Sequence, residues 1–297
     1  MELGKLQKPN FFILGAPKCG TTSLARWLGE HPNIFMAPQK EPHFFNTDDR
    51  QGVTTLVQYE DLFRNAQKEH VAVGEASVWY LSSSHAVNNI LEYNPNARFI
   101  VMVRNPIEMA PALHGQMLIG GLECVRDFSQ AWNLQEERRH GRRLPALSWT
   151  RRRFLYGDIC SVGAQLDRLL SLVPAHRVLV IVLDDLRADP RREYFRALTF
   201  LGVHDDERFD FPIYNTAVLL RWPSLQRFFF CLSEIKTRLG IESRSGFLDR
   251  LEPINWVSKS RPPLPPALET ALKKYFSGDV NLLCRLLDRD DLRSWLV

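Results

Sequence analysis

The stretch from Phe11 to Gly29 constrains the fold of this chain more than any other part of the sequence. An apolar run, Phe11–Leu14, leads directly into the glycine-framed loop GAPKCGTTS (Gly15–Ser23), and apolar side chains then recur at helical spacing. This pattern predicts a buried strand, a tight loop and a helix. Backbone N–H groups at a helix N-terminus lack intrahelical partners and lie at the positive end of the helix dipole, so we expect the loop to bind an anion.

Further apolar runs predict a parallel sheet. Buried strands are expected at Val71–Val73, Arg98–Val103 and Val178–Leu183, and helical periodicity covers 159–172, 189–201 and 265–287. Strands that alternate with helices predict an α/β protein with a P-loop-like three-layer fold, in which helices flank a central parallel sheet. Ligands of such sheets bind at the carboxyl ends of the strands.

The composition is that of a globular protein. Of the 297 residues, 45% are hydrophobic and 24% are charged, which is enough apolar material for one domain spanning 1–297. A net charge of +4 does not call for a nucleic-acid partner. No apolar run approaches the roughly 20 residues of a membrane helix, and the first ten residues are too polar for a signal peptide. We therefore expect a soluble, cytoplasmic protein.

The cysteines point to neither a disulfide framework nor a zinc site. There are five, an odd number, and none has CxxC or Cys/His spacing. We expect reduced thiols.

The position of the loop lysine separates this loop from the P-loop of nucleotide triphosphatases. In the pattern GxxxxGK[ST] a lysine follows the last glycine, whereas here Thr21 follows Gly20 and the lysine lies inside the loop, at Lys18. Lys18 is therefore expected to lie over the anion that the loop itself binds.

Five motifs resemble, in their order along the chain, the sulfotransferases that use 3′-phosphoadenosine 5′-phosphosulfate (PAPS), particularly the bacterial and heparan sulfate-type branch. The motifs are PKCGTTSL (17–24), KEPHFF (40–45), GEAS (74–77), RNP (104–106) and SKSR (258–261). They span most of the chain. The resemblance implies transfer of a sulfuryl group from PAPS to a hydroxyl or amine of a carbohydrate, a lipid or a small natural product.

The resemblance also implies a set of cofactor-binding residues. Lys18 would stabilise charge on the leaving phosphate, and Arg104 would bind the 3′-phosphate, whose oxygens match a guanidinium fork. The set is Lys18, Cys19, Gly20, Thr21, Thr22, Ser23, Arg104, Lys259 and Ser260. No metal is expected, because the donor already carries a good leaving group.

The acceptor must lose a proton, which requires a base within hydrogen-bond reach. By resemblance the base is Glu41, with His43 as the alternative, so that the catalytic set is Glu41, Lys18 and His43. Glu75, after the second predicted strand, is expected at the edge of the same cleft.

Two departures keep alternatives open. Ala112 stands where the family usually has a serine that binds the 3′-phosphate, a loss of about 1.5–3 kcal/mol in binding, and Pro111 is expected to kink or break a helix there. These residues suggest a non-catalytic nucleotide-binding relative.

Asp184 and Asp185 after a strand are typical of a magnesium-dependent P-loop kinase. The sequence leaves the acceptor and the oligomeric state unknown.

Overall fold

A computed structural model describes residues 7–48, 52–146, 148, 150–214, 218–238, 255–258 and 263–297. The chain divides into two compact units, each made of separate stretches. The first comprises Met1–Asn105, Val162–Asn215 and Asn281–Asp290, and the second comprises Pro106–Ser161, Thr216–Val280 and Asp291–Val297. A single domain spanning 1–297 stays a prediction.

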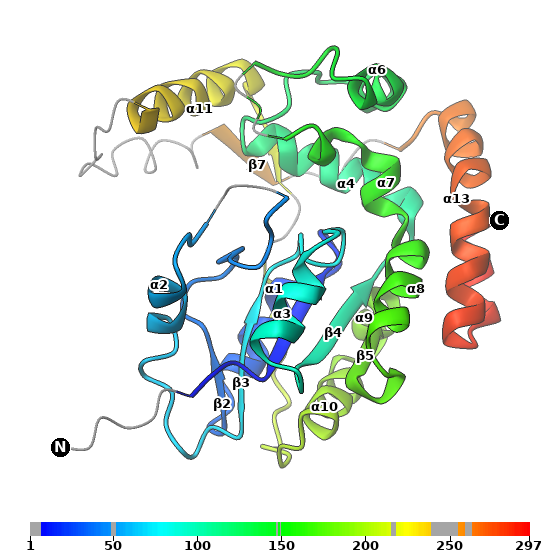
Figure 1. The fold of residues 1–297 in the computed structure, drawn as a ribbon. Coiled ribbons are helices and arrows are strands. Elements are labelled where there is room, and N and C mark those ends of the chain that lie inside the picture. Colours follow the sequence, from blue (N-terminus) through cyan, green and yellow to red (C-terminus); the bar gives the residue numbers. More distant parts are fainter. Residues whose placement is uncertain are drawn as a thin grey trace. The chain divides into compact units, whose positions relative to one another are not determined.

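The first unit is built on a five-stranded parallel sheet with the strand order β2-β3-β1-β4-β5 (Figure 1). Its strands are β1 (Phe11–Gly15), β2 (Ile34–Met36), β3 (Ala72–Ala76), β4 (Arg98–Val103) and β5 (Val178–Val182). All residues of β1 and β3 are buried, as expected for strands covered on both faces. The four predicted strands are confirmed. The short edge strand β2 was not predicted.

Helices flank this sheet (Figure 1). They are α1 (Thr21–Gly29), α2 (Leu56–Asp61), α3 (Ala86–Tyr93), α8 (Val162–Leu172), α9 (Leu183–Ala188) and α10 (Pro190–Leu201), with a short 3₁₀ turn η2 (Ala175–Arg177) before β5. The helix after the loop, α1, packs on α10 and on three strands, while α3 packs on α8. The predicted three-layer α/β arrangement is confirmed.

Local sequence explains where α10 begins and ends. The Asp189 carboxylate accepts a hydrogen bond of 3.0 Å from the Arg192 N–H, and Pro190 occupies the first helical position, where no N–H is needed. Gly202 ends the helix in a left-handed conformation with φ of 72°.

The second unit is mainly helical in its described residues. It contains α4 (Pro106–Ile119), α5 (Phe128–Asn133), α6 (Gln135–Arg139), η1 (Arg152–Phe154), α7 (Tyr156–Cys160), α11 (Pro223–Arg238) and most of α13 (Pro266–Leu287) and η4 (Asp290–Leu296). Strands β6 (Val218–Leu220) and β7 (Trp256–Ser258) pair antiparallel. The helices predicted at 159–172 and 265–287 are confirmed, although α7 and α8 share the first stretch.

The expected break at Pro111 is wrong. Pro111 lies inside α4, which continues through it to Ile119. The missing N–H removes only the bond to Ile107, near the start of the helix, and the residues on either side of Pro111, Ala110 and Ala112, are fully buried. Packing of these neighbours compensates for the lost bond.

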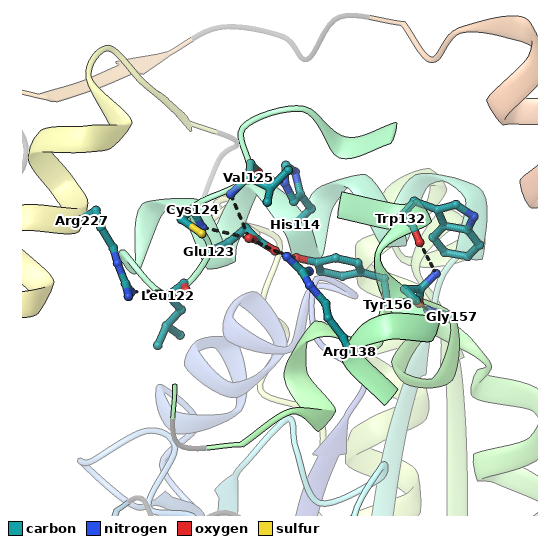
Figure 2. A network of polar contacts seen from close by, with 11 residues as sticks. His114, Leu122, Glu123, Cys124, Val125, Trp132, Arg138, Tyr156, Gly157 and Arg227 are labelled. Atoms are coloured by element: carbon teal, nitrogen blue, oxygen red, sulfur yellow. Dashed lines mark hydrogen bonds and ion pairs between the residues drawn. The ribbon is translucent and has the colours of Figure 1, made fainter. Parts of the chain in front are cut away.

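A buried polar network in the second unit centres on Glu123, which follows α4 (Figure 2). Its carboxylate accepts two bonds from the Arg138 guanidinium, at 2.7 and 3.0 Å, and one from the Tyr156 hydroxyl at 2.6 Å. Burial alone would raise the pKa of Glu123, but the bonds from Arg138 and Tyr156 hold it below its ordinary value. The ion pair connects the chain after α4 to α6, and the bond from Tyr156 connects it to α7.

We predict that Arg138 and its neighbour Arg139 differ sharply in their effect on stability. Both side chains of the Arg138–Glu123 pair are 0% exposed, whereas Arg139, which binds Asp158, is 45% exposed. Arg138→Met should lower the free energy of unfolding by about 3–5 kcal/mol, because Glu123 is left buried without its counter-charge. Arg139→Met should cost less than about 1 kcal/mol. Urea unfolding measures both, and equal losses would contradict the assignment.

Candidate active site

The loop between β1 and α1 leads into the helix N-terminus through Gly20. The register of β1 against β4 shifts between Ile13 and Gly15, so the chain bends out of the sheet as the loop begins. Gly20 precedes α1 with φ of 88°, no side chain caps the helix at this position, and its first turn contains no acidic residue. Such a terminus is suited to bind an anion.

The loop side chains differ in what they can offer a ligand. Lys18 and Thr22 are partly exposed, whereas Thr21 and Ser23 are buried. The Cys19 thiol is buried near the Pro17 carbonyl oxygen, and burial raises the pKa of Cys19 to about 12. Cys19 is therefore protonated at neutral pH, and only its backbone N–H is suited to contact an anion.

Arg104 follows β4 and reaches the same loop. Its Nη1 atom donates a hydrogen bond of 3.1 Å to the Lys18 carbonyl oxygen. Both residues are partly exposed. The Arg104 side chain therefore contacts the backbone of the loop at Lys18.

Glu41 is fixed at the carboxyl end of β3. Its N–H donates to the Ala76 carbonyl oxygen at 3.0 Å, and its Oε2 atom accepts from the Val78 N–H at 2.9 Å. The Lys40 ammonium pairs with Oε1, and His43 Nε2 lies 3.5 Å from Oε2. Glu41 keeps 27% of its side chain exposed, against 10% for His43.

Val78 links Glu41 to the loop. A Cβ atom on Gly15 would lie 2.4 Å from the Val78 carbonyl oxygen, and Gly15 also has φ of 128°. Only glycine fits there. Because the N–H of the same Val78 binds the Glu41 carboxylate, the start of the loop and Glu41 belong to one site.

Lys259 and Ser260, which were predicted to bind the cofactor, are outside the described residues. Ala112 is fully buried in α4 of the second unit, and His114 Nε2 lies 2.8 Å from the Val125 carbonyl oxygen in that unit (Figure 2). Asp185 is bound by both Nη atoms of Arg289, at 2.7 and 3.2 Å. Among the described residues, no group of three or more His, Cys, Asp or Glu side chains is placed to hold a metal ion.

The comparison with known families agrees with this geometry. The profile of the Sulfotransferase domain family matches residues 8–217, which include the loop, Glu41 and Arg104. The chain belongs to the sulfotransferase family.

Individual sulfotransferases show the extent of the likeness. The chain is 29% identical over 203 residues to human heparan sulfate glucosamine 3-O-sulfotransferase 6, covering 67% of this chain and 54% of that one. It is 28% identical over 100 residues to the membrane-associated sulfotransferase kil1 of Dictyostelium discoideum, covering 34% and 21%. The chain thus spans about half or less of these relatives. The crystal structure of a sulfotransferase from Alicyclobacillus acidocaldarius matches with a TM-score of 0.71 and 26% identity over 97% of this chain and 99% of that chain.

In this member of the sulfotransferase family, Glu75, which was expected at the edge of the cleft, is a buried residue of β3. It is only 1% exposed, because β3 is covered on both faces. Burial raises the pKa of Glu75 to about 7, and nearby Glu41 adds to the rise, while hydrogen bonds from Ser77, Tyr80 and Tyr59 oppose it. Sequence reasoning also missed Val78, which acts through its backbone and leaves no side-chain signal.

We predict a pH-dependent stability that Glu75 controls. The folded protein holds the Glu75 proton up to about pH 7, whereas the unfolded chain releases it near 4.5. The free energy of unfolding contributed by Glu75 should therefore fall by roughly 3 kcal/mol as the pH rises through this window, and stay constant above it. The difference between the unfolding free energies of the wild type and Glu75→Gln, measured with urea at each pH, isolates this slope. The exposed control, Glu69→Gln, should leave it unchanged, and an equal slope in Glu75→Gln would refute the assignment.

Proposed function

We propose that this protein transfers the sulfuryl group of PAPS to an acceptor hydroxyl or amine, with Glu41 as the base. The observation that carries the proposal is the contact of Val78 with both Gly15 and Glu41, because it joins a carboxylate to an anion-binding loop. Sulfuryl transfer needs these two parts side by side: donors for the charge on the phosphosulfate, and a base for the acceptor proton.

The residues of the loop fit the phosphosulfate end of PAPS. Gly15 and Gly20 have positive φ, and the first turn of α1 contains no acidic residue that would repel an anion. Residues Lys18 to Ser23 would hold the 5′-phosphosulfate, and Arg104 the 3′-phosphate. Lys259 and Ser260 are assigned to the cofactor by resemblance. When bound, PAPS supplies a sulfuryl group on a good leaving group.

Glu41 is better suited than His43 to take the acceptor proton. Its carboxylate is the more exposed of the two groups, and the Val78 N–H and the Lys40 ammonium hold it in one orientation. Held in this way, Glu41 accepts a proton without first reorganising its surroundings. Lys18 carries the complementary role, which is to stabilise negative charge on the leaving phosphate.

A carbohydrate hydroxyl is the acceptor that we favour. The matched human relative is named for the glucosamine of heparan sulfate, and the acceptor of this chain is inferred from that name alone. Within the described part of the chain, no helix is both long and apolar enough to span a membrane. A cytoplasmic location stays a prediction.

The kinase alternative is disfavoured by the surroundings of Asp185. A magnesium ligand needs carboxylate oxygens that are open to the ion, whereas both oxygens of Asp185 accept bonds from Arg289. The alternative of a non-catalytic nucleotide-binding relative rests on Ala112, and a transfer assay decides it.

We predict that Glu41→Gln lowers kcat for sulfuryl transfer from labelled PAPS by about 10²–10⁴-fold, because the acceptor keeps its proton in the transition state. The KM for PAPS should change little. Lys68 and Glu69 are consecutive in sequence, as Lys40 and Glu41 are, and both are exposed. Glu69→Gln is therefore the matched control and should keep full activity. If His43→Asn abolishes turnover while Glu41→Gln retains it, His43 is the base. No transfer to any acceptor would refute the function.

A further inference from the structure

Three buried hydroxyl groups surround Glu75. The Tyr59 hydroxyl donates to Oε1 at 3.3 Å and the Ser77 hydroxyl to Oε2 at 2.8 Å. The Tyr80 hydroxyl lies near enough to interact electrostatically with Glu75. All four side chains are almost completely buried. Glu75 therefore has hydroxyl donors around it, without a basic residue among these hydrogen bonds.

Two of these hydroxyls also hold the backbone of the segment that carries Glu41. The His43 N–H donates to Ser77 Oγ at 3.2 Å, and the Phe45 N–H donates to the Tyr80 hydroxyl oxygen at 3.3 Å. Glu41 and His43 both have positive φ, at 62° and 54°. Residues other than glycine rarely adopt this conformation unless their surroundings enforce it.

The directions of these hydrogen bonds depend on one another. A hydroxyl has a single proton, and the Ser77 hydroxyl, which accepts from the His43 N–H, donates its proton to Glu75. Only an ionised carboxylate accepts at every position without offering a donor. An acceptor at Glu75 therefore orients the Ser77 hydroxyl so that its oxygen faces the His43 N–H.

We propose that Glu75 is a positioning residue for Glu41: its ionised carboxylate accepts the proton of Ser77, whose oxygen accepts from the His43 N–H, and so fixes the backbone of residues 41–46. The function of Glu41 rests on the proposed sulfuryl transfer. The effect of Glu75 on the backbone does not.

The proposal has a pH dependence. Burial raises the pKa of Glu75 to about 7, so the carboxylate is half protonated near neutral pH. The titratable groups that face it are Tyr59 from α2, Tyr80 after β3, and Glu41 from the segment itself. A protonated Glu75 adds a donor where Ser77 and Tyr59 already donate. Order in residues 41–46 should therefore decline as the pH falls through about 7.

Glu75→Gln tests the proposal, because the amide keeps the shape of the carboxylate but replaces one acceptor oxygen by an NH₂ donor. The matched control is Glu60→Gln. Glu60 also accepts from a tyrosine hydroxyl, that of Tyr93 at 3.1 Å, and has no hydrogen bond to residues 41–46 among those described.

The first measurement is hydrogen exchange of the amides of residues 41–46 in the full chain. Glu75→Gln should exchange at least about tenfold faster than the wild type at pH 8, and Glu60→Gln should match the wild type. Wild-type protection, corrected for intrinsic exchange rates, should rise with pH through about 7, and this rise should be lost in Glu75→Gln.

The second measurement is the pH profile of kcat. At pH 8, Glu75→Gln should lower kcat by about 10- to 100-fold with unchanged affinity for adenosine 3′,5′-bisphosphate, since the loop is intact, and the limb near pH 7 should vanish. A limb that belongs to His43 would persist in the variant.

The outcomes separate the two proposals. Exchange and kcat like those of Glu60→Gln would overturn the positioning role, and so would faster exchange spread over the whole protein with a lower melting temperature at pH 8. Exchange in residues 41–46 that is faster in Glu75→Gln than in the wild type, together with a wild type that transfers no sulfuryl group, would support the positioning of the segment and refute the role of Glu41.

Discussion

The approach of Gly15 to the Val78 carbonyl oxygen is the contact on which the candidate site depends. Gly15 ends β1 and begins the loop, Val78 follows β3, and the Val78 N–H binds the carboxylate of Glu41. A side chain at position 15 would push Val78 away and move Glu41 with it. Three stretches that are distant in sequence therefore share one backbone junction, and β1 and β3 are neighbours in the sheet that supports it.

Each unit contains a buried glutamate, and the pKa values of these two residues are shifted in opposite directions. Glu123 has an arginine as partner, and the hydrogen bonds from Arg138 and Tyr156 outweigh the effect of burial, so its pKa is lowered. Among the described residues, the side-chain donors to Glu75 are hydroxyl groups, and Glu41 is a second carboxylate nearby, so burial dominates and the pKa of Glu75 is raised. The first arrangement keeps Glu123 ionised and paired with Arg138 at neutral pH. The second leaves a carboxyl group that titrates in the physiological range, beside the proposed base.

Much of the fold could be predicted from sequence, because β1, β4 and β5 are unbroken apolar runs and the loop has a distinctive glycine and lysine pattern. The edge strand β2 was missed because Ile34–Met36 is too short to show a pattern. The contacts around Glu41 were only partly predictable. Val78 contributes backbone atoms, and Ser77 and Tyr80 act on residues more than 30 positions away, so no local pattern reports them. The burial of Glu75 was not predicted, because a sequence does not show how deeply a strand end is covered.

We propose that the loop and Arg104 form a site for the adenosine 3′,5′-bisphosphate part of PAPS. Isothermal titration of the full chain with adenosine 3′,5′-bisphosphate measures this binding. We predict an affinity in the micromolar range that Arg104→Ala weakens at least tenfold, because a charge-assisted bidentate contact is lost. An affinity no better than millimolar, or a clear preference for ATP with magnesium, would contradict it.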